Sequence, residues 1–314
     1  MESPQNIKKR LKSVSNIGKI TKAMELVAAT KMRKSQEIAL SSRPYAFAAL
    51  DFLATISSLD QKLPELFKKR IVKKVLFVVV SSDKGLAGAF NSSVFRKFEM
   101  HQKSEREEWK NENHFYITIG EKAFNHLTKK GFNVLKKFTS VGDYTTTEQV
   151  FPVTDFIVKG YLEYKWDRVI VVSTHFRSAL KQEPHVRRVL PVDYEHIRET
   201  IQQIIPERGK FAELMKEHQI TFVPDKLKIK QYKIEPSPEE VLNRLAEHLF
   251  SMQFYHLILE ANASEHSARR MAMKTASDNA SDLGNALNLQ YNKSRQSRIT
   301  TEISEISAGA EALN

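Results

Sequence analysis

The sequence predicts a mixed α/β protein in which two long helices, one at each end of the chain, flank a small α/β domain. Apolar residues recur every three or four positions near both ends of the chain. Short, strongly apolar segments alternate with helical patterns in the middle. We therefore expect an N-terminal shaft helix at 1–65, a central α/β domain with peripheral insertions at 66–236, and a C-terminal shaft helix at 237–314.

Composition limits the possible classes of protein. The chain has 314 residues, of which 41% are hydrophobic, enough to bury a core. It has no cysteine, which excludes disulfides and thiolate metal sites and is typical of a reducing compartment. No segment approaches the roughly 18 apolar residues of a membrane span, and the start lacks the apolar core of an export signal. The net charge of +12 favours an acidic or polyanionic partner, which could be nucleic acid, a membrane surface or acidic protein loops.

The N-terminal helix is predicted to begin at Ser3 and Pro4, a pair typical of helix starts. Pro44 should kink or interrupt this helix before the pattern resumes toward Leu59. Gly18 costs about 1 kcal/mol relative to alanine, without a local reason in the sequence. One apolar stripe is expected to face a partner helix, and it comprises Ile7, Leu11, Val14, Ile17, Ile20, Met24 and Val27.

The central region is expected to form a parallel sheet, because strand and helix patterns alternate along it. Charged segments without a clear pattern, at 101–114 and 206–234, are predicted to be loops or peripheral insertions. The predicted elements are buried strands at 75–80, 115–120 and 166–174, a helix at 147–164 and an edge strand at 186–191.

The C-terminal helix is predicted to begin at Ser237 and Pro238, with two glutamates near its positive end. Between Ala261 and Ala280 its interface residues are alanines instead of larger apolar residues, which predicts a thin, closely packed helix pair. A last apolar stripe at Ile299, Ile303 and Ile306 should extend past the shorter N-terminal helix. That tip must find another partner or fray.

Three segments suggest chemistry, and each has a structural alternative that we favour. SSDKGLAG lacks the spacing of a phosphate loop, so we expect a sharp turn that needs Gly85 and Gly88. His256 and Glu260 could chelate a metal, but a packed histidine is the favoured interpretation. The basic N-terminal positions lack interleaved aromatic residues, which favours a solvated face over a nucleic-acid surface. We therefore predict no catalytic, cofactor-binding or metal-binding residues.

Motifs at both ends of the chain and after the first strand carry a family resemblance: KITKAMELVAATKMRKSQ with SRPY, VVSSDKGLAGAFN, and SEHSARRMAMKTASDNASDL with LQYNKSRQSRITTEISEISAGA. In these motifs the chain resembles the gamma subunit of the bacterial F-type ATP synthase. The resemblance implies an antiparallel coiled coil of the terminal helices beside a Rossmann-like domain. The implied function is that of a non-catalytic rotor shaft, which couples ion flow through a membrane c-ring to conformational change in catalytic beta subunits.

The resemblance also implies partners, a location and contact residues. The partners are three alpha subunits, three beta subunits, an epsilon subunit and the c-ring, without nucleic acid. The location is the cytoplasmic side of a bacterial inner membrane, as a peripheral protein. Tyr232 and Glu235 fall where relatives touch the c-ring. The residues expected to face acidic beta-subunit loops are Met24, Lys31, Arg33, Asp83, Lys84, Arg295, Gln296, Thr300 and Glu302.

Two other classes of protein remain as alternatives. A basic coiled-coil protein that binds nucleic acid would explain the charge, but should show sustained leucine heptads, which this sequence lacks. An α/β enzyme with helical extensions would explain the middle of the chain, but the sequence offers no convergent nucleophile, base or metal site.

Overall fold

The computed structural model describes residues 3–41, 64–108, 113–192 and 235–311. The chain divides into two compact units. Unit 1 comprises Met1–Ala28 with Arg269–Asn314, and unit 2 comprises Ala29–Ala268. Two long helices, α1 (Pro4–Ser41) and α8 (Pro238–Glu311), contribute to both units. The predicted kink at Pro44 and the predicted insertion at 206–234 lie outside the described residues.

Unit 2 contains a five-stranded sheet in the order β3-β2-β1-β4-β5. The strand β1 lies at its centre and pairs in parallel with β2 and β4, while β5 closes one edge in the antiparallel direction. Strands are added outward from β1, first β2 and β3 on one side and then β4 and β5 on the other. This order is that of a doubly wound Rossmann-like domain. The strands are β1 (Lys74–Val80), β2 (Asn113–Ile119), β3 (Val134–Phe138), β4 (Arg168–Phe176) and β5 (Gln182–Leu190).

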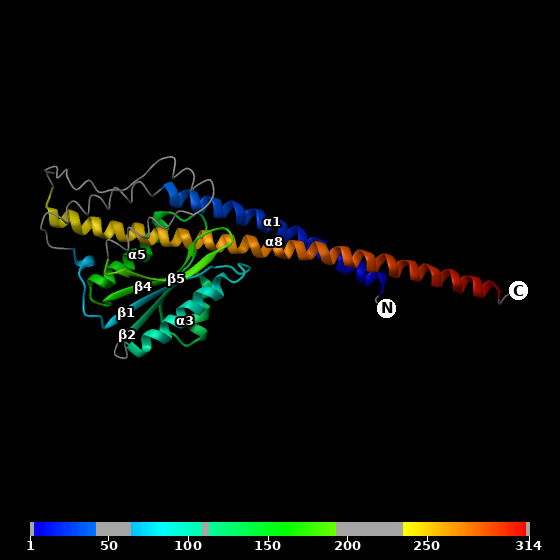
Figure 1. The fold of residues 1–314 in the computed structure, drawn as a ribbon, viewed down its shortest axis with the longest axis horizontal. Helices are drawn as coiled ribbons and strands as arrows, with labels where there is room; N and C mark the ends of the chain where they lie inside the picture. Colours follow the sequence, from blue (N-terminus) through cyan, green and yellow to red (C-terminus); the bar gives the residue numbers. More distant parts are fainter. Residues whose placement is uncertain (1–2, 42–63, 109–112, 193–234, 312–314) are drawn as a thin grey trace. The chain divides into compact units, whose positions relative to one another are not determined.

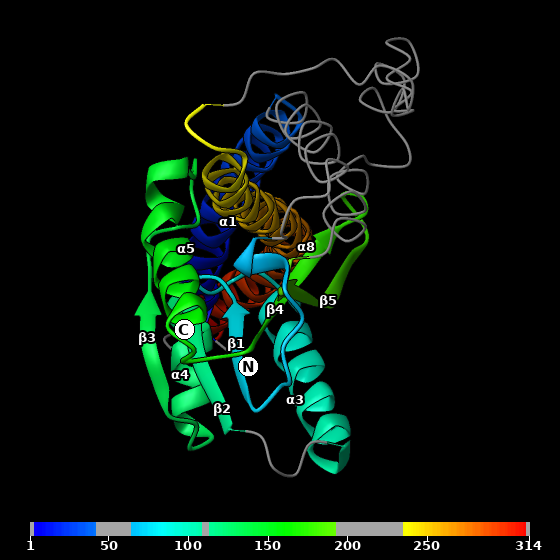
Figure 2. The ribbon, with the colours of Figure 1, turned by 90° about the vertical axis from the view of Figure 1, so that its left-hand side faces the viewer.

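Helices cover both faces of this sheet (Figure 2). Alternate residues of β1 point to opposite faces, so Phe77 packs with Phe98 and Leu127 in one core cluster, whereas Leu76 belongs to the other. The first cluster lies under α3 (Phe90–Glu108) and α4 (Glu121–Lys129). The second lies under α5 (Thr147–Leu162) and the first part of α8, beside the short helix η1 (Glu65–Phe67).

Unit 1 is an antiparallel coiled coil of α1 and α8, as the family resemblance implies (Figure 1). The inward-facing residues of each helix alternate in steps of four and three, which gives the 3.5-residue period of a left-handed coiled coil. The seam residues of α1 are Ile7, Leu11, Val14, Gly18, Thr21, Glu25 and Ala28, and those of α8 are Met273, Ser277, Ala280, Gly284, Leu287, Tyr291 and Ser294.

The predicted apolar stripe of α1 is partly wrong. Its first three members lie on the seam, but Ile17, Ile20 and Val27 are 53%, 60% and 55% exposed. The predicted stripe takes three successive steps of three residues after Leu11, and it therefore drifts off a face that repeats every 3.5 residues. The seam instead continues through Gly18 and Thr21, which are small or polar.

Gly18 finds its explanation at this seam. A Cβ atom added at Gly18 would lie 3.4 Å from the Cβ atom of Ala280. The glycine therefore belongs to a point of close approach between the two helices, where a longer side chain would have to push them apart.

Most predicted elements are confirmed, and the errors lie in polar segments. Both helix starts are capped: the Ser3 hydroxyl accepts from the amide of Asn6 at 3.4 Å, and the Ser237 hydroxyl accepts from that of Glu240 at 3.2 Å. Residues 101–108 belong to α3 and 113–114 to β2, so the predicted loop there is wrong. The strand β3 was not predicted, because its VLKKF sequence is largely solvent-exposed at the sheet edge and lacks a strong apolar pattern.

The loop after β1 is only partly as predicted. Gly88 has a φ of 55°, in the left-handed region that favours glycine. Gly85 does not have a positive φ, and a Cβ atom there would meet nothing within 4 Å. The residue that adopts the left-handed conformation instead is Leu86, with a φ of 62°. The predicted requirement for Gly85 is therefore wrong.

Candidate functional site

An apolar strip lies on the outer face of α1 in unit 1. Ile17, Ile20 and Val27 are exposed there, and Met24 is half-buried on the same helix face. Two exposed lysines, Lys19 and Lys22, flank the strip. An exposed apolar strip with basic neighbours suits contact with a protein surface that is partly apolar and partly acidic. All four residues were predicted to face the partner helix of the coil, and Met24 was also predicted to contact a beta subunit.

The tip of α8 continues beyond the N-terminus of α1 (Figure 1). Seam burial ends at Ser294, and every residue from 295 to 308 is exposed. Ile299, Ile303 and Ile306 lie on one helix face and are 47%, 59% and 73% exposed. The predicted extension of this stripe past α1 is thus confirmed.

Four polar residues of the α8 tip were predicted to contact another subunit. Among the described residues, their hydrogen bonds are made within α8 itself. Glu302 accepts a hydrogen bond from the Arg298 Nε atom at 2.7 Å, and the Thr300 hydroxyl donates to the carbonyl of Gln296 at 3.0 Å. Arg295 and Gln296 are also exposed. These four predicted positions, Arg295, Gln296, Thr300 and Glu302, therefore present their side chains to solvent together with the isoleucine stripe.

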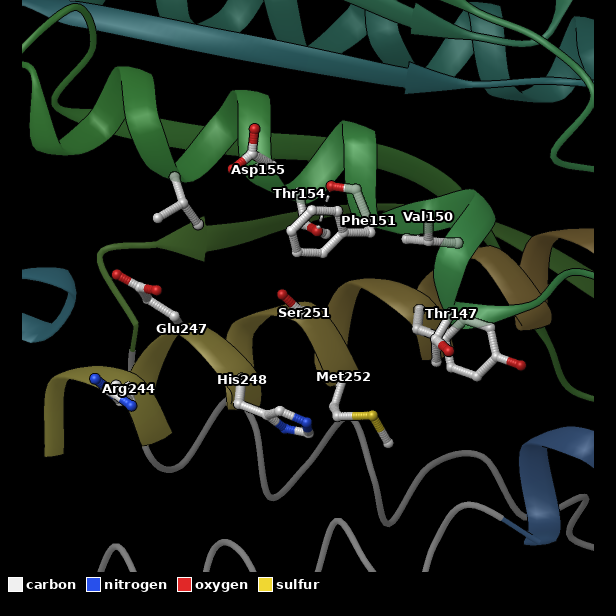
Figure 3. Close-up of a pocket in the computed structure, with 12 residues that line it drawn as sticks. Thr147, Val150, Phe151, Thr154, Asp155, Arg244, Glu247, His248, Ser251 and Met252 are labelled. Carbon is white, nitrogen blue, oxygen red and sulfur yellow. Dashed lines mark hydrogen bonds between the residues drawn. The ribbon is translucent and has the colours of Figure 1, made fainter. Parts of the chain in front are cut away.

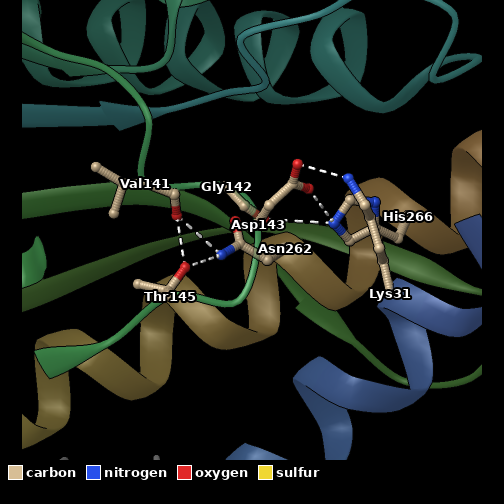
Figure 4. A network of polar contacts seen from close by, with 7 residues as sticks. All are labelled: Lys31, Val141, Gly142, Asp143, Thr145, Asn262 and His266. Atoms are coloured by element: carbon tan, nitrogen blue, oxygen red, sulfur yellow. Dashed lines mark hydrogen bonds and ion pairs between the residues drawn. The ribbon is translucent and has the colours of Figure 1, made fainter.

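Lys31 takes part in a polar network within unit 2 (Figure 4). Its Nζ atom donates to Asp143 Oδ2 at 2.5 Å, and His266 Nε2 lies 3.3 Å from Asp143 Oδ1. Burial acts to raise the pKa of the Asp143 carboxyl, but the hydrogen bond and charge of Lys31, with the charges of His266 and Lys84, lower it below its usual value. Lys31 thus has an intramolecular partner, and its contact with another subunit stays a prediction. Arg33, two residues on, is exposed.

Asp83 lies at the carboxyl end of the parallel strands. Its carboxylate accepts hydrogen bonds from the amides of Glu121 at 3.0 Å and Ser140 at 2.9 Å. These two hydrogen bonds link the loops that follow β1, β2 and β3. The Asp83 carboxylate also lies at the N-terminus of α4, where it accepts from the first backbone amide of the helix. Its neighbour Lys84 is exposed. A contact of either residue with another subunit stays a prediction.

Glu235 is exposed and precedes α8, whereas Tyr232 lies outside the described residues.

A second set of polar contacts joins α8 to the loop before α5 (Figure 4). The Tyr255 hydroxyl donates to the carbonyl of Thr145 at 2.9 Å. The amide nitrogen of Asn262 donates to the carbonyl of Val141 at 3.0 Å and to the Thr145 hydroxyl at 2.7 Å. Sequence reasoning missed Tyr255 and Asn262. The available signal was the change from apolar to polar residues on α8 between Gln253 and Ser267.

A third set joins α8 to β4 and to the connection between β4 and β5. His175 Nδ1 lies 2.8 Å from Glu260 Oε2, and both side chains are buried. The Ser267 hydroxyl donates to the carbonyl of Ala179 at 2.7 Å. His256 is fully buried, as the packed interpretation predicted. Within the described ranges, no group of three or more His, Cys, Asp or Glu side chains is placed to hold a metal ion.

A groove of about 330 Å³ lies between α5 and α8 (Figure 3). Its lining mixes apolar side chains, such as Val150 and Met252, with the ionisable residues Asp155, Glu247 and His248. These ionisable groups do not form a nucleophile and base pair in the contacts that the structure defines.

None of the helices in the described ranges is long and apolar enough to cross a membrane.

Comparison with known proteins identifies the family. A family model described as ATP synthase matches residues 3–313. The ATP synthase gamma chain of Roseiflexus castenholzii is 35% identical over 316 residues, covering 100% of this chain and 99% of the relative. The chain belongs to the ATP synthase gamma chain family. The gamma chain of Herpetosiphon aurantiacus is 37% identical over the full length of both proteins. The gamma chain of Acetobacterium woodii, described as sodium ion specific, is 34% identical.

Solved structures show the same fold. The rotor of the Euglena gracilis mitochondrial ATP synthase matches with a TM-score of 0.59 at 17% identity, covering 94% of this chain and 98% of that one. The central stalk and c-ring structure from Tetrahymena thermophila contains a chain that matches with a TM-score of 0.55 at 22% identity, covering 82% and 99%. The architecture of two long helices with an α/β domain is therefore that of ATP synthase central-stalk chains.

Proposed function

We propose that the chain is the central rotor shaft of an F-type ATP synthase and couples ion flow through a membrane c-ring to conformational change at catalytic beta subunits. Family membership over the full length of the chain supports this role. The observation that carries the mechanical part is the uncovered isoleucine stripe of the α8 tip. Burial of each such side chain contributes about 1.5 to 3 kcal/mol, so an assembly that encloses the tip would be stabilised by it.

The mechanism is coupling by unequal contact. A rotating shaft changes the state of a neighbouring subunit only if it contacts the alternative states of that subunit unequally. The outer face of α1 is apolar with lysines beside it, whereas the α8 tip combines isoleucines with Arg295 and Glu302. A surrounding ring of three alpha and three beta subunits would therefore meet different chemistry in each orientation of the shaft.

The remaining assignments follow from this role. The regions 1–65 and 237–314 act as the shaft, and the region 66–236 acts as the head beside it. An epsilon subunit and the c-ring bind the head end, with Tyr232 and Glu235 at the ring. The chain itself is a non-catalytic subunit, and it lies peripherally on the cytoplasmic side of a bacterial inner membrane. The residues that contact beta subunits are Met24, Lys31, Arg33, Asp83, Lys84, Arg295, Gln296, Thr300 and Glu302.

Reconstitution tests the proposal. The chain is combined with the alpha, beta, epsilon and membrane-sector subunits of its source in vesicles, with ATP hydrolysis and ATP-driven ion uptake measured on the same sample. We expect the complete mixture to pump ions and the mixture without this chain to hydrolyse ATP without pumping. Equal pumping with and without the chain would exclude the role of a shaft.

A further inference from the structure

We propose that the buried pair His175–Glu260 fixes the axial register of α8 on the sheet of unit 2, so that these are positioning residues for torque transmission. The inference rests on the proposed function and assigns the joint between head and shaft to particular side chains. It concerns only contacts within unit 2, since β4 and residues 238–268 of α8 both belong to that unit.

The geometry shows a buried contact between residues far apart in the chain. His175 is 1% exposed and Glu260 is 5% exposed, and the atoms Nδ1 and Oε2 lie 2.8 Å apart. The remaining polar atoms, His175 Nε2 and Glu260 Oε1, are buried without a hydrogen-bond partner among the described residues. One hydrogen bond offsets only part of the free energy needed to remove a carboxyl group and an imidazole from water. Stability alone therefore does not explain why the pair is present.

Glu260 belongs to a buried polar stripe on α8. The members follow one another in steps of three and four residues and therefore share one helix face. One turn beyond Ser264, Ser267 contacts the β4–β5 connection through Ala179. Other positions of α8, such as Leu249 and Leu257, belong to the apolar core cluster. The stripe consists of Gln253, His256, Glu260, Ser264 and Ser267, each at most 5% exposed.

A polar stripe resists a slip that an apolar stripe permits. Aliphatic side chains one turn apart are similar in shape, so a displacement of about 5.4 Å along the helix replaces one apolar contact by another. The same displacement would separate Glu260 from His175 and leave both buried without each other. Buried polar groups set the register of coiled coils in this way, at a cost in stability.

The register matters because α8 continues from Glu260 to Ile299 as one helix without a break. In the proposed function, torque passes between the sheet of unit 2 and α8 through this joint, so a slip there would transmit it imperfectly.

The first experiment measures register in the isolated, full-length chain. The protein has no cysteine, so Asn243→Cys on α8 and Glu163→Cys after α5 carry the only two spin labels, both at exposed positions. We expect one narrow distance in the parent. The double variant His175→Leu/Glu260→Met, which makes the joint apolar, should give a second or broadened distance while melting no lower than the parent. A single narrow distance at the parent value, or failure of the double variant to fold, would overturn the proposal.

A matched control separates register from stability. Leu257→Ala removes a buried apolar side chain of α8 three residues before Glu260. It should lower the melting temperature yet keep the single narrow distance. The conservative variant Glu260→Gln, whose amide group can donate to or accept from His175 Nδ1, should also keep it. If Leu257→Ala broadened the distance as much as the double variant, the pair would have no special role in register.

The second experiment measures coupling in reconstituted vesicles. We expect the double variant to lower the ions transported per ATP hydrolysed at least twofold, with Leu257→Ala and Glu260→Gln close to the parent. Unchanged coupling in the double variant would contradict the role in torque transmission. If the parent chain itself failed to couple, the proposed function would fail, whereas the spin-label distances would still report whether the pair sets the register.

Discussion

At the scale of single residues, small side chains decide how closely the two helices of unit 1 approach. Gly18 faces Ala280 at a distance that leaves room for little more than a methyl group. Gly284 also lies on the seam, but a Cβ atom there would meet nothing within 4 Å. The two glycines therefore occupy equivalent positions in the pattern without the same steric requirement.

This difference gives a paired prediction. Gly284→Ala should stabilise the helix by up to about 1 kcal/mol, because alanine has the higher helix propensity and the space is open. Gly18→Leu should destabilise unit 1, because the longer side chain must displace Ala280. Thermal unfolding followed by circular dichroism measures both changes. A Gly18→Leu protein as stable as the parent would mean that the helices do not approach closely at this point.

Asp143 gives a prediction of pH dependence. Its pKa is lowered in the folded chain, since the attraction of Lys31 and neighbouring cations outweighs the opposing effect of burial. The network therefore contributes stability above the ordinary aspartate pKa of 3.8, and this contribution is lost as the pH falls through the lower folded value.

The Asp143→Asn variant should accordingly unfold at a lower temperature than the parent at pH 7. The two proteins should converge in acid, once the pH falls below the lowered pKa of Asp143 and the parent carboxylate is also protonated. A difference in melting temperature that stayed constant from pH 7 to pH 2.5 would show that the charge of Asp143 is not the cause.

Residue-level sequence reasoning identified the helix caps but not the seam. Ser3 and Ser237 were found because a cap acts within one turn of its own residue. The seam positions Gly18 and Thr21 carry no apolar signal, so only the contact with the second helix reveals them. His175 was missed for the same reason, since its partner Glu260 lies 85 residues away.

At the scale of elements, the tip of α8 is the clearest case of a surface built for a partner. Removing residues 306–314 takes away one isoleucine of the stripe and should weaken assembly or torque while leaving some ATPase activity. Removing everything after Tyr291 also deletes Arg295, Gln296, Thr300 and Glu302, and it should impair coupling far more. Both truncations are measured by ion uptake and ATP hydrolysis in vesicles. Assembly and pumping at the parent level by both would exclude a function for the tip.

The exposed strip of α1 gives a further prediction at this scale. Met24→Lys adds a cation at the edge of the strip, beside Lys19 and Lys22. If acidic loops of a beta subunit bind there, the added charge should hold them too tightly and lower the ions transported per ATP hydrolysed. Met100→Lys makes the same change at an exposed position on α3 and should leave coupling unchanged. Equal coupling in both variants would contradict the placement of Met24 at this contact.

Elements with a continuous or periodic apolar pattern could be predicted from the sequence. The central strands β1 and β4 are buried on both faces, and they contain the unbroken apolar runs VLFVVV and VIVV. The edge strand β3 and the last turns of α3 are polar, and their structure depends on pairing or on helix continuation. Sequence patterns report burial more directly than they report hydrogen bonding, which is why these two segments escaped prediction.

At the scale of the whole molecule, the proposed role requires that catalysis belong to other subunits. We expect the highly purified chain to show no ATP hydrolysis, because Asp83 bonds to backbone amides rather than standing free to bind a phosphate-bound cation. Release of phosphate is measured with the isolated chain and with Asp83→Ala and Lys84→Ala variants. Turnover by the parent that either variant abolished would overturn the non-catalytic assignment.

The family could be predicted from sequence motifs at both ends of the chain, and the comparisons confirm it. How the head is fastened to α8 could not be predicted, because that joint is made of contacts between distant segments. The Lys31–Asp143–His266 network, for example, joins α1, the loop before α5 and α8. The sequence around each of these three residues does not indicate that it contacts the other two.

The left-handed wrapping of unit 1 has a consequence for torsional elasticity. A twist that tightens the supercoil draws the helices together, and at Gly18 and Ala280 there is little space left to close. A twist in the opposite sense opens the seam, where most side chains are small or polar and few apolar contacts resist separation. The coil should therefore behave as an asymmetric spring, stiffer in one sense of rotation than in the other.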